Sequence, residues 1–309
     1  MALAAGGVVT ALNFMTIKDY FAGMDYEPGP EMAAIMDELG LSDKALMIFK
    51  ASHPVLMERG DFNRQCREDE TDTAILGCYD GETIYVYNIV NDEISGVREL
   101  ATAHELLHAV YARMDAEQRT ELGAALSEVY QTEPSDIGTE LDLYAEPERM
   151  EELYVRVGTE IKDLPGVLER HYREIFDDQD KIVEYYNSYI AVFREVNAAV
   201  EALKTELTDV KATLDAEVAE YEQRARQLNA DVVSFNACAK TPDCFDSDSV
   251  FATRRQWLVD EQVNLKEKYA SINNLVEQYN ALVTEYNANI IRGQTLNQAI
   301  NSSVDLMDI

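Results

Sequence analysis

The second half of the chain carries a long helical repeat that is almost free of glycine and proline. Between about residues 179 and 236, apolar residues recur mostly at spacings of three and four. From residue 265 to residue 290 the steps alternate four and three without a break, which is the spacing of the buried seam of a coiled coil. The seam positions of this second stretch are Leu265, Tyr269, Ile272, Val276, Tyr279, Val283, Tyr286 and Ile290. Two long helices are therefore expected.

A short polar segment, residues 236–249, separates the two helical stretches. It contains Pro242 and the cysteines Cys238 and Cys244, which flank a sequence with the composition of a turn. We therefore expect residues 178–309 to form a long antiparallel coiled-coil hairpin, with its tip near residues 236–249. A seam rich in tyrosine is wide, so a second copy of the chain or another protein partner is expected to pack against the coiled coil.

The cysteines form two local pairs in the sequence. Cys66 and Cys78 flank an acidic stretch, so the pairings 66–78 and 238–244 are favoured among the three that four cysteines allow. Neither pair has the twin CxxC spacing of a zinc ribbon. Because disulfides form in oxidising compartments, this pairing favours an extracytoplasmic or envelope-associated location; reduced structural cysteines are the alternative.

The chain is strongly acidic, with a formal net charge of −32 over 309 residues. Such a surface repels nucleic acid and anionic membranes, so neither is an expected partner. No segment reaches the 18 or so apolar residues of a membrane span. Residues 1–14 are apolar but lack a basic region, so they suggest an N-terminal helix packed on the core, or the remainder of a removed leader or anchor.

The first half, residues 1–177, is expected to be an α+β domain that is mainly helical. Residues 45–49 predict a short buried strand. Residues 75–79 and 83–87, joined by Asp80-Gly81, predict a β-hairpin. Helices are expected at about residues 31–40, 96–114, 116–131, 146–162 and 165–177.

The chemistry of the chain is concentrated in the sequence His104-Glu105-Leu106-Leu107-His108. Positions four apart on a helix face the same way, so His104 and His108 can bind one Zn²⁺ through neutral nitrogens. Glu105 then lies beside the open coordination position, where it can act as general base toward water. Two of the four histidines of the chain fall in this motif, which makes a chance match improbable. The alternative is a core helix with two structural histidines, in which a buried Glu105 would lack a partner.

This motif resembles the zincin metallopeptidases, over about residues 45–175. The resemblance implies a zinc-dependent hydrolase that cleaves peptide bonds in a peptide or protein substrate. The preceding β-hairpin is similar to the edge strand that these enzymes place beside the substrate cleft. Tyr111 and Met114 stand where the metzincin branch has glycine and its third histidine, so that branch is excluded.

The gluzincin branch is the closer resemblance, and it takes its third ligand from a glutamate of a later helix. The expected helix at residues 146–162 offers several. Glu152 is the first choice, although Glu151 precedes it where the family often has asparagine. Glu160 is the main rival, followed by Glu151 and Glu148.

Two further residues are candidates for stabilising the oxyanion that forms when water adds to a carbonyl. His171 and Tyr172 lie beyond the expected ligand helix, and either side chain has the required donor. Structural roles are the alternative for both, as they are for His53.

A second function, of another class, fits the same sequence. More than a third of the chain is helical hairpin, so the protein is alternatively an envelope or surface interaction protein that acts through its coiled coil. The metal site would then be structural or idle. Glu105 argues against this reading, since a purely structural zinc site gains nothing from a glutamate beside an open position.

Overall fold

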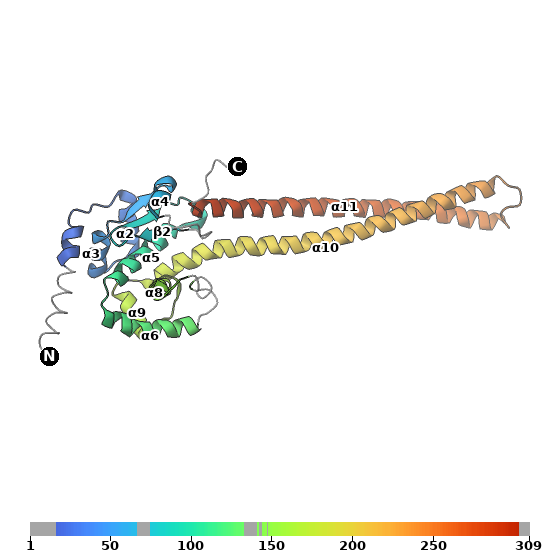
Figure 1. Ribbon diagram of the computed structural model, residues 1–309. Helices are drawn as coiled ribbons and strands as arrows, with labels where there is room; N and C mark the ends of the chain where they lie inside the picture. Colours follow the sequence, from blue (N-terminus) through green and yellow to red (C-terminus); the bar gives the residue numbers. More distant parts are fainter. Residues whose placement is uncertain (1–16, 67–74, 133–140, 142–143, 147, 303–309) are drawn as a thin grey trace. The chain divides into compact units, whose positions relative to one another are not determined.

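The computed structural model describes residues 17–66, 75–132, 141, 144–146 and 148–302 (Figure 1). It divides into two compact units. The first contains residues 1–194 and 295–309, and the second contains residues 195–294. The division lies inside a long helix and not at residue 178, because Ile182 and Val183 of that helix are buried in the first unit.

The first unit is mainly helical with one small sheet, as its predicted α+β class requires. Residues 17–23 form its first described helix. Its other elements are α2 (Pro30–Leu39), α3 (Asp43–Ala51), β1 (Val55–Met57), α4 (Arg59–Cys66), β2 (Gly77–Tyr79), β3 (Ile84–Tyr87), a 3-10 turn η1 (Asp92–Ile94), α5 (Val97–Ala112), α6 (Ala116–Thr132), α8 (Glu148–Glu160) and α9 (Gly166–Arg173).

The described sheet has three strands in the order β1-β3-β2. The predicted hairpin is confirmed: β2 runs antiparallel to β3, with Cys78 opposite Tyr85. Its turn follows from Asp80-Gly81, since the Asp80 carboxylate accepts from two backbone amides of the turn and Gly81 has a φ of 95°. Because the strand order places β2 last, β2 is an edge strand of the described sheet.

The strand predicted at residues 45–49 is wrong, because these residues belong to helix α3. The hydroxyl of Ser42 accepts from the amide of Ala45 and caps the helix. Ala45, Ile48 and Phe49 are buried at helical spacing. A short apolar run alone does not distinguish a strand from a buried helix. Here the Ser42 cap favours a helix that begins at Asp43. A strand does follow this helix: β1 begins at Val55 and pairs in parallel with β3.

Helix α5 lies at the centre of the first unit. It packs against β2 and β3 and also against α2, α3 and α8. Ala103, Leu106, Leu107 and Ala109 are fully buried. The residues of the predicted motif are thus carried by a rigid helix that is enclosed by the core.

The second unit is the predicted helical hairpin. It is formed by most of α10 (Gln179–Ala239) and most of α11 (Asp248–Ile300), which run side by side in Figure 1. Ion pairs join the helices in antiparallel register, among them Arg224 with Glu261 and Lys268 with Glu217. The buried seam is made by Leu203, Val210 and Leu282 with Leu207, Tyr279 and Tyr286 packed against it.

Both predicted disulfides are present. Cys66 is bonded to Cys78, which ties α4 to the edge strand β2, and Cys238 is bonded to Cys244 between the two long helices. Two disulfides fit an extracytoplasmic location. Within the described residues, none of the helices combines the length and the hydropathy that a membrane crossing needs.

Candidate metal centre

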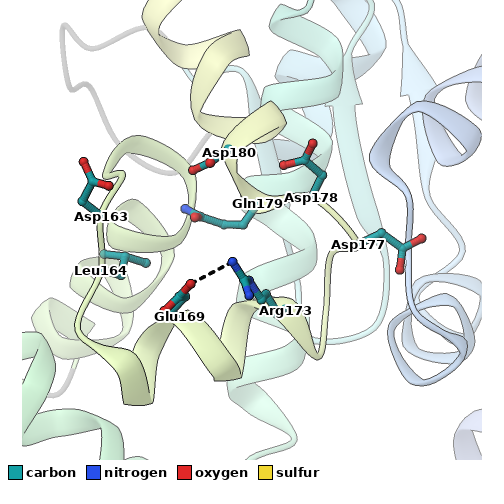
Figure 2. A pocket seen from close by; sticks show the side chains of 8 residues that line it. All are labelled: Asp163, Leu164, Glu169, Arg173, Asp177, Asp178, Gln179 and Asp180. Atoms are coloured by element: carbon teal, nitrogen blue, oxygen red, sulfur yellow. Dashed lines mark ion pairs between the residues drawn. The ribbon is translucent and has the colours of Figure 1, made fainter.

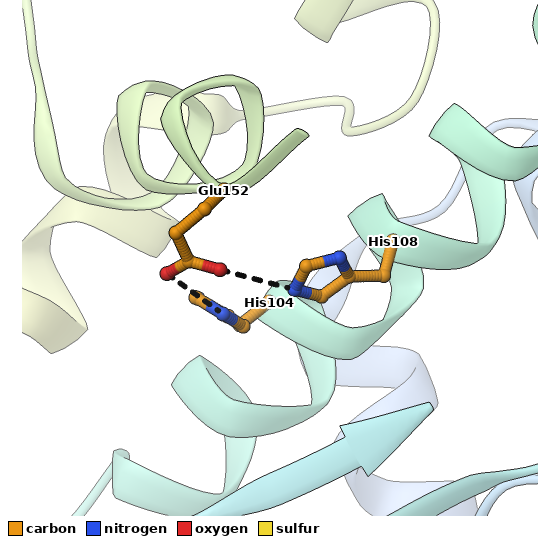
Figure 3. A group of neighbouring side chains, drawn as sticks. All are labelled: His104, His108 and Glu152. Atoms are coloured by element: carbon orange, nitrogen blue, oxygen red, sulfur yellow. Dashed lines mark ion pairs between the residues drawn. The ribbon is translucent and has the colours of Figure 1, made fainter. Parts of the chain in front are cut away.

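Helix α5 presents both histidines of the motif on one face. The ring centroids of His104 and His108 lie 5.2 Å apart, as expected for side chains one helical turn apart. The Nε2 atoms of both rings face Glu152 of helix α8 (Figure 3). About a quarter of the His104 side chain and a fifth of the His108 side chain are exposed, so the pair can be reached from solvent.

Helix α8 brings Glu152 to this pair. One carboxylate oxygen lies 3.8 Å from Nε2 of His104, and the other lies 3.5 Å from Nε2 of His108 (Figure 3). Zinc ligands at about 2.1 Å in a tetrahedron lie roughly 3.4 Å from one another, so these separations fit a shared ion. One donor atom from each of the three residues lies within 4.8 Å of the others. His104, His108 and Glu152 can therefore hold a metal ion.

A glycine lets the two helices approach closely enough for this contact. A Cβ on Gly158 of α8 would lie 2.6 Å from Leu107 of α5 and 2.5 Å from the ring of Tyr172. A Cβ essentially never lies this close to a non-bonded atom, so any other residue at position 158 would force Leu107 or Tyr172 to shift. The packing of α8 on α5, and with it the position of Glu152, depends on this missing side chain.

The proposed general base, Glu105, extends its side chain from α5 toward the edge strand β2. It is only 6% exposed, and burial raises its pKa to about 7. A Cβ on Gly77 of β2 would lie 2.7 Å from Cγ of Glu105. Gly77 was not predicted as part of the site, although a single glycine inside a strand pattern indicates close approach of another group.

The two histidines differ in protonation. Burial lowers the pKa of His104 to about 4, so its ring is neutral. Burial would also lower the pKa of His108, but hydrogen bonds to Glu151 and Glu152 outweigh it and raise the value to about 10. The Nδ1–H of His108 donates to the Glu151 carboxylate at 2.9 Å.

Glu152 itself is ionised. Burial acts to raise its pKa, but the hydrogen bond from His108 and the positive charges of His108 and Arg156 outweigh burial and lower it. An ionised carboxylate is the form that binds a metal cation.

The other three candidates for the third ligand have different surroundings from Glu152. Glu160 accepts two hydrogen bonds from Arg156, at 2.9 and 3.1 Å. Glu151 orients His108 through the nitrogen that faces away from the ligand group. Glu148 is exposed in the first turn of α8. Among these four, only Glu152 belongs to the three-residue group.

His171 and Tyr172 are not brought to this group. Nε2 of His171 is hydrogen-bonded to the hydroxyl of Tyr154 at 2.9 Å, and burial lowers the His171 pKa to about 4. Tyr172 is fully buried, and its hydroxyl donates to the carbonyl of Tyr154 at 2.6 Å. Both side chains therefore support α8 from within the core. His53 also lies elsewhere, with Nε2 at 2.8 Å from the carbonyl oxygen of Ala22.

A separate hollow lies beside the start of α10 (Figure 2). Its charged groups include a Glu169–Arg173 ion pair, and Gln179 donates to the carbonyls of Gly158 and Ile161. The remaining lining residues are Asp163, Leu164, Asp177, Asp178 and Asp180. It contains no residue of the candidate metal group, and exposed acidic side chains alone assign no ligand to it.

Comparisons of the chain with protein-family models, with curated proteins and with solved structures found no match.

Proposed function

We propose that this protein is a zinc-dependent metallopeptidase whose metal ligands are His104, His108 and Glu152. One observation carries the proposal: these three donors converge within 4.8 Å of one another, next to the buried carboxyl of Glu105. Two imidazoles and one carboxylate, with a further position left for a small molecule, are the usual ligand set of a catalytic zinc site.

The donor set also favours zinc over other cations. Mg²⁺ and Ca²⁺ prefer sites built from oxygen ligands, whereas imidazole nitrogens suit zinc and its neighbours among the transition metals. A zinc ion held here would supply Lewis acidity that polarises a substrate carbonyl.

The residues of the chain would carry the proton transfers. The ionised carboxylate of Glu105 accepts a proton from the attacking water as its oxygen bonds to the carbonyl carbon. The same carboxyl group then delivers that proton to the amine nitrogen as the C–N bond breaks. A pKa of about 7 suits a group that must accept and return a proton near neutral pH.

An extended peptide is the substrate form that the sheet favours. Strand β2 is at the edge of the described sheet, and Gly77 on this strand lies against Glu105. A peptide that pairs with β2 by backbone hydrogen bonds would run past the general base.

The test is peptide hydrolysis by the zinc-loaded protein, measured on a mixture of unrelated peptides by mass spectrometry. Glu105→Gln keeps the size of the side chain but removes the base, so cleavage is expected to fall roughly 10²- to 10⁴-fold while zinc content is unchanged. Glu148→Gln on the exposed first turn of α8 is the matched control and should keep full activity. Equal cleavage by wild type and Glu105→Gln would refute the proposed mechanism.

A further inference from the structure

One side of the helix at residues 17–23 packs against the rest of the first unit. Asp19 is buried and accepts hydrogen bonds from Nε and Nη2 of Arg113, at 2.9 and 3.1 Å. The carbonyl of Ala22 is bonded to the His53 ring, and Gly23 approaches the Cβ of Lys50. Residues 19, 22 and 23 fall on one side of a helix with about 100° of rotation per residue.

The opposite side of this helix is an exposed apolar stripe. Ile17, Tyr20 and Phe21 have the spacing i, i+3 and i+4, which places them on one face of the helix, and Met24 follows in the turn directly after it. Their exposed fractions are 54%, 60%, 65% and 59%. An ordinary surface helix turns its apolar face to the core, so this helix has the reverse orientation and is held in it by the Asp19–Arg113 ion pair.

The stripe is too small to be the main contact of a stable dimer. Four half-exposed side chains of this size offer on the order of 500 Å², whereas a stable protein interface buries roughly 800 Å² on each partner. Contiguous apolar surface of this kind on a monomer usually marks a binding site. A lipid surface needs no matching second protein, only apolar and aromatic side chains that reach the acyl boundary.

The sequence before the stripe supports a lipid surface. Residues 1–16, which precede the stripe in the sequence, contain no charged side chain, the kind of group that is most costly near a bilayer. Tyrosine and phenylalanine beside isoleucine and methionine are the composition favoured at the boundary between headgroups and acyl chains. The net charge of −32 opposes approach to anionic lipid, which leaves a zwitterionic bilayer as the favoured surface.

We infer that Ile17, Tyr20, Phe21 and Met24 form a site that binds the surface of a zwitterionic phospholipid bilayer. The Asp19–Arg113 ion pair joins this site to the residue that follows helix α5, so binding would hold the first unit at the bilayer. The inference does not depend on the metal centre and stands whether or not the protein is a peptidase.

The experiment is co-flotation of the full chain with phosphatidylcholine vesicles. Wild type should float with the vesicles, and Tyr20→Ser with Phe21→Ser should bind roughly tenfold more weakly or worse, because two aromatic side chains no longer leave water. Ile17→Ser with Met24→Ser is a second, independent pair with the same expected direction. The matched control replaces Val233 and Trp257, exposed apolar residues of the second unit, by serine and should bind like wild type.

Circular dichroism checks that each variant is folded. Addition of phosphatidylserine to the vesicles is expected to weaken binding, most strongly at low ionic strength. Unchanged flotation of both stripe variants, or no flotation of wild type, would overturn the inference. Self-association of wild type without lipid, lost in both stripe variants, would overturn it in favour of a second copy of this chain.

Discussion

His104 and His108 occupy equivalent positions on one helix face, yet their environments differ. His108 has two carboxylate partners, Glu151 on Nδ1 and Glu152 near Nε2, whereas His104 has only the longer contact with Glu152. A carboxylate on the far nitrogen fixes the ring orientation and the tautomer of a metal ligand. Glu151 is therefore a positioning residue for His108.

Replacement of Glu151 should weaken zinc binding without abolishing it. We expect Glu151→Ala to raise the zinc dissociation constant about 10- to 100-fold, because the His108 ring is no longer held. Glu151→Gln keeps an acceptor oxygen and should fall between alanine and wild type. Competition titration against a chromogenic chelator measures the constants, with Glu148→Gln as control. Wild-type affinity in Glu151→Ala would show that the hydrogen bond does not orient the ligand.

His171 makes a pH-dependent contribution to stability. Its pKa is lowered from 6.5 to about 4 in the folded protein, first by burial and then by the nearby charge of Lys44. Since the unfolded state takes up the proton more readily, this contribution is present above pH 6.5 and is lost as the pH falls toward 4. His171→Gln should therefore lose less stability than wild type over this range. Urea unfolding of the metal-free proteins at several pH values tests this, and identical pH slopes would contradict it.

Most of the candidate metal centre was predictable, because the motif fixes its histidines and Glu105 by spacing alone. The positions of His104, Glu105 and His108 follow from one helix, and Glu152 followed from the resemblance of its helix to the gluzincin ligand helix. The roles of Glu151 and Gly77 were missed, since both depend on which neighbouring element packs against α5. His171 and Tyr172 were proposed as site residues because they follow the ligand helix, but packing turns them to Tyr154 in the core.

At the scale of elements, the site depends on the close packing of α8 against α5. Gly158 is the point of closest approach, where an added Cβ would meet Leu107 and Tyr172. Both neighbours are fully buried. The close packing of α8 on α5 therefore positions the three proposed ligands.

Gly158→Ala should damage this packing. We expect a loss of about 1–3 kcal/mol in the free energy of unfolding, as for other overpacked cores, together with weaker zinc binding as Glu152 moves. Gly123→Ala in α6 is the matched control: nothing lies within 4 Å of its added Cβ, so the better helix propensity of alanine should raise stability by about 0.5–1 kcal/mol. Thermal and urea unfolding measure both. A neutral Gly158→Ala would show that the helices separate easily.

Element types were predictable where a local signal accompanied the hydrophobic pattern. Asp80-Gly81 defined the hairpin, and the unbroken apolar spacing defined α10 and α11. Residues 45–49 show the opposite case, since five apolar residues suit a strand as well as a helix, and the deciding cap at Ser42 lies outside the run. Strand β1 was missed because three residues are too few for a periodic pattern.

At the scale of the whole molecule, two units with separate cores share two continuous helices. The division inside α10 was not predictable, because the helical pattern continues across it while the packing partners change. The chemistry proposed above belongs to the first unit and does not involve the hairpin. We therefore expect the first unit to hold one metal ion.

Elemental analysis of the purified protein after incubation with zinc at neutral pH tests for this ion. We expect about one zinc per chain in wild type and in the Glu148→Gln control, loss of zinc in the double variant His104→Ala with His108→Ala, and weakened binding in Glu152→Gln. No zinc in wild type, or equal zinc in wild type and in the double histidine variant, would contradict it. The helical hairpin would then be the part of the chain to which function must be assigned.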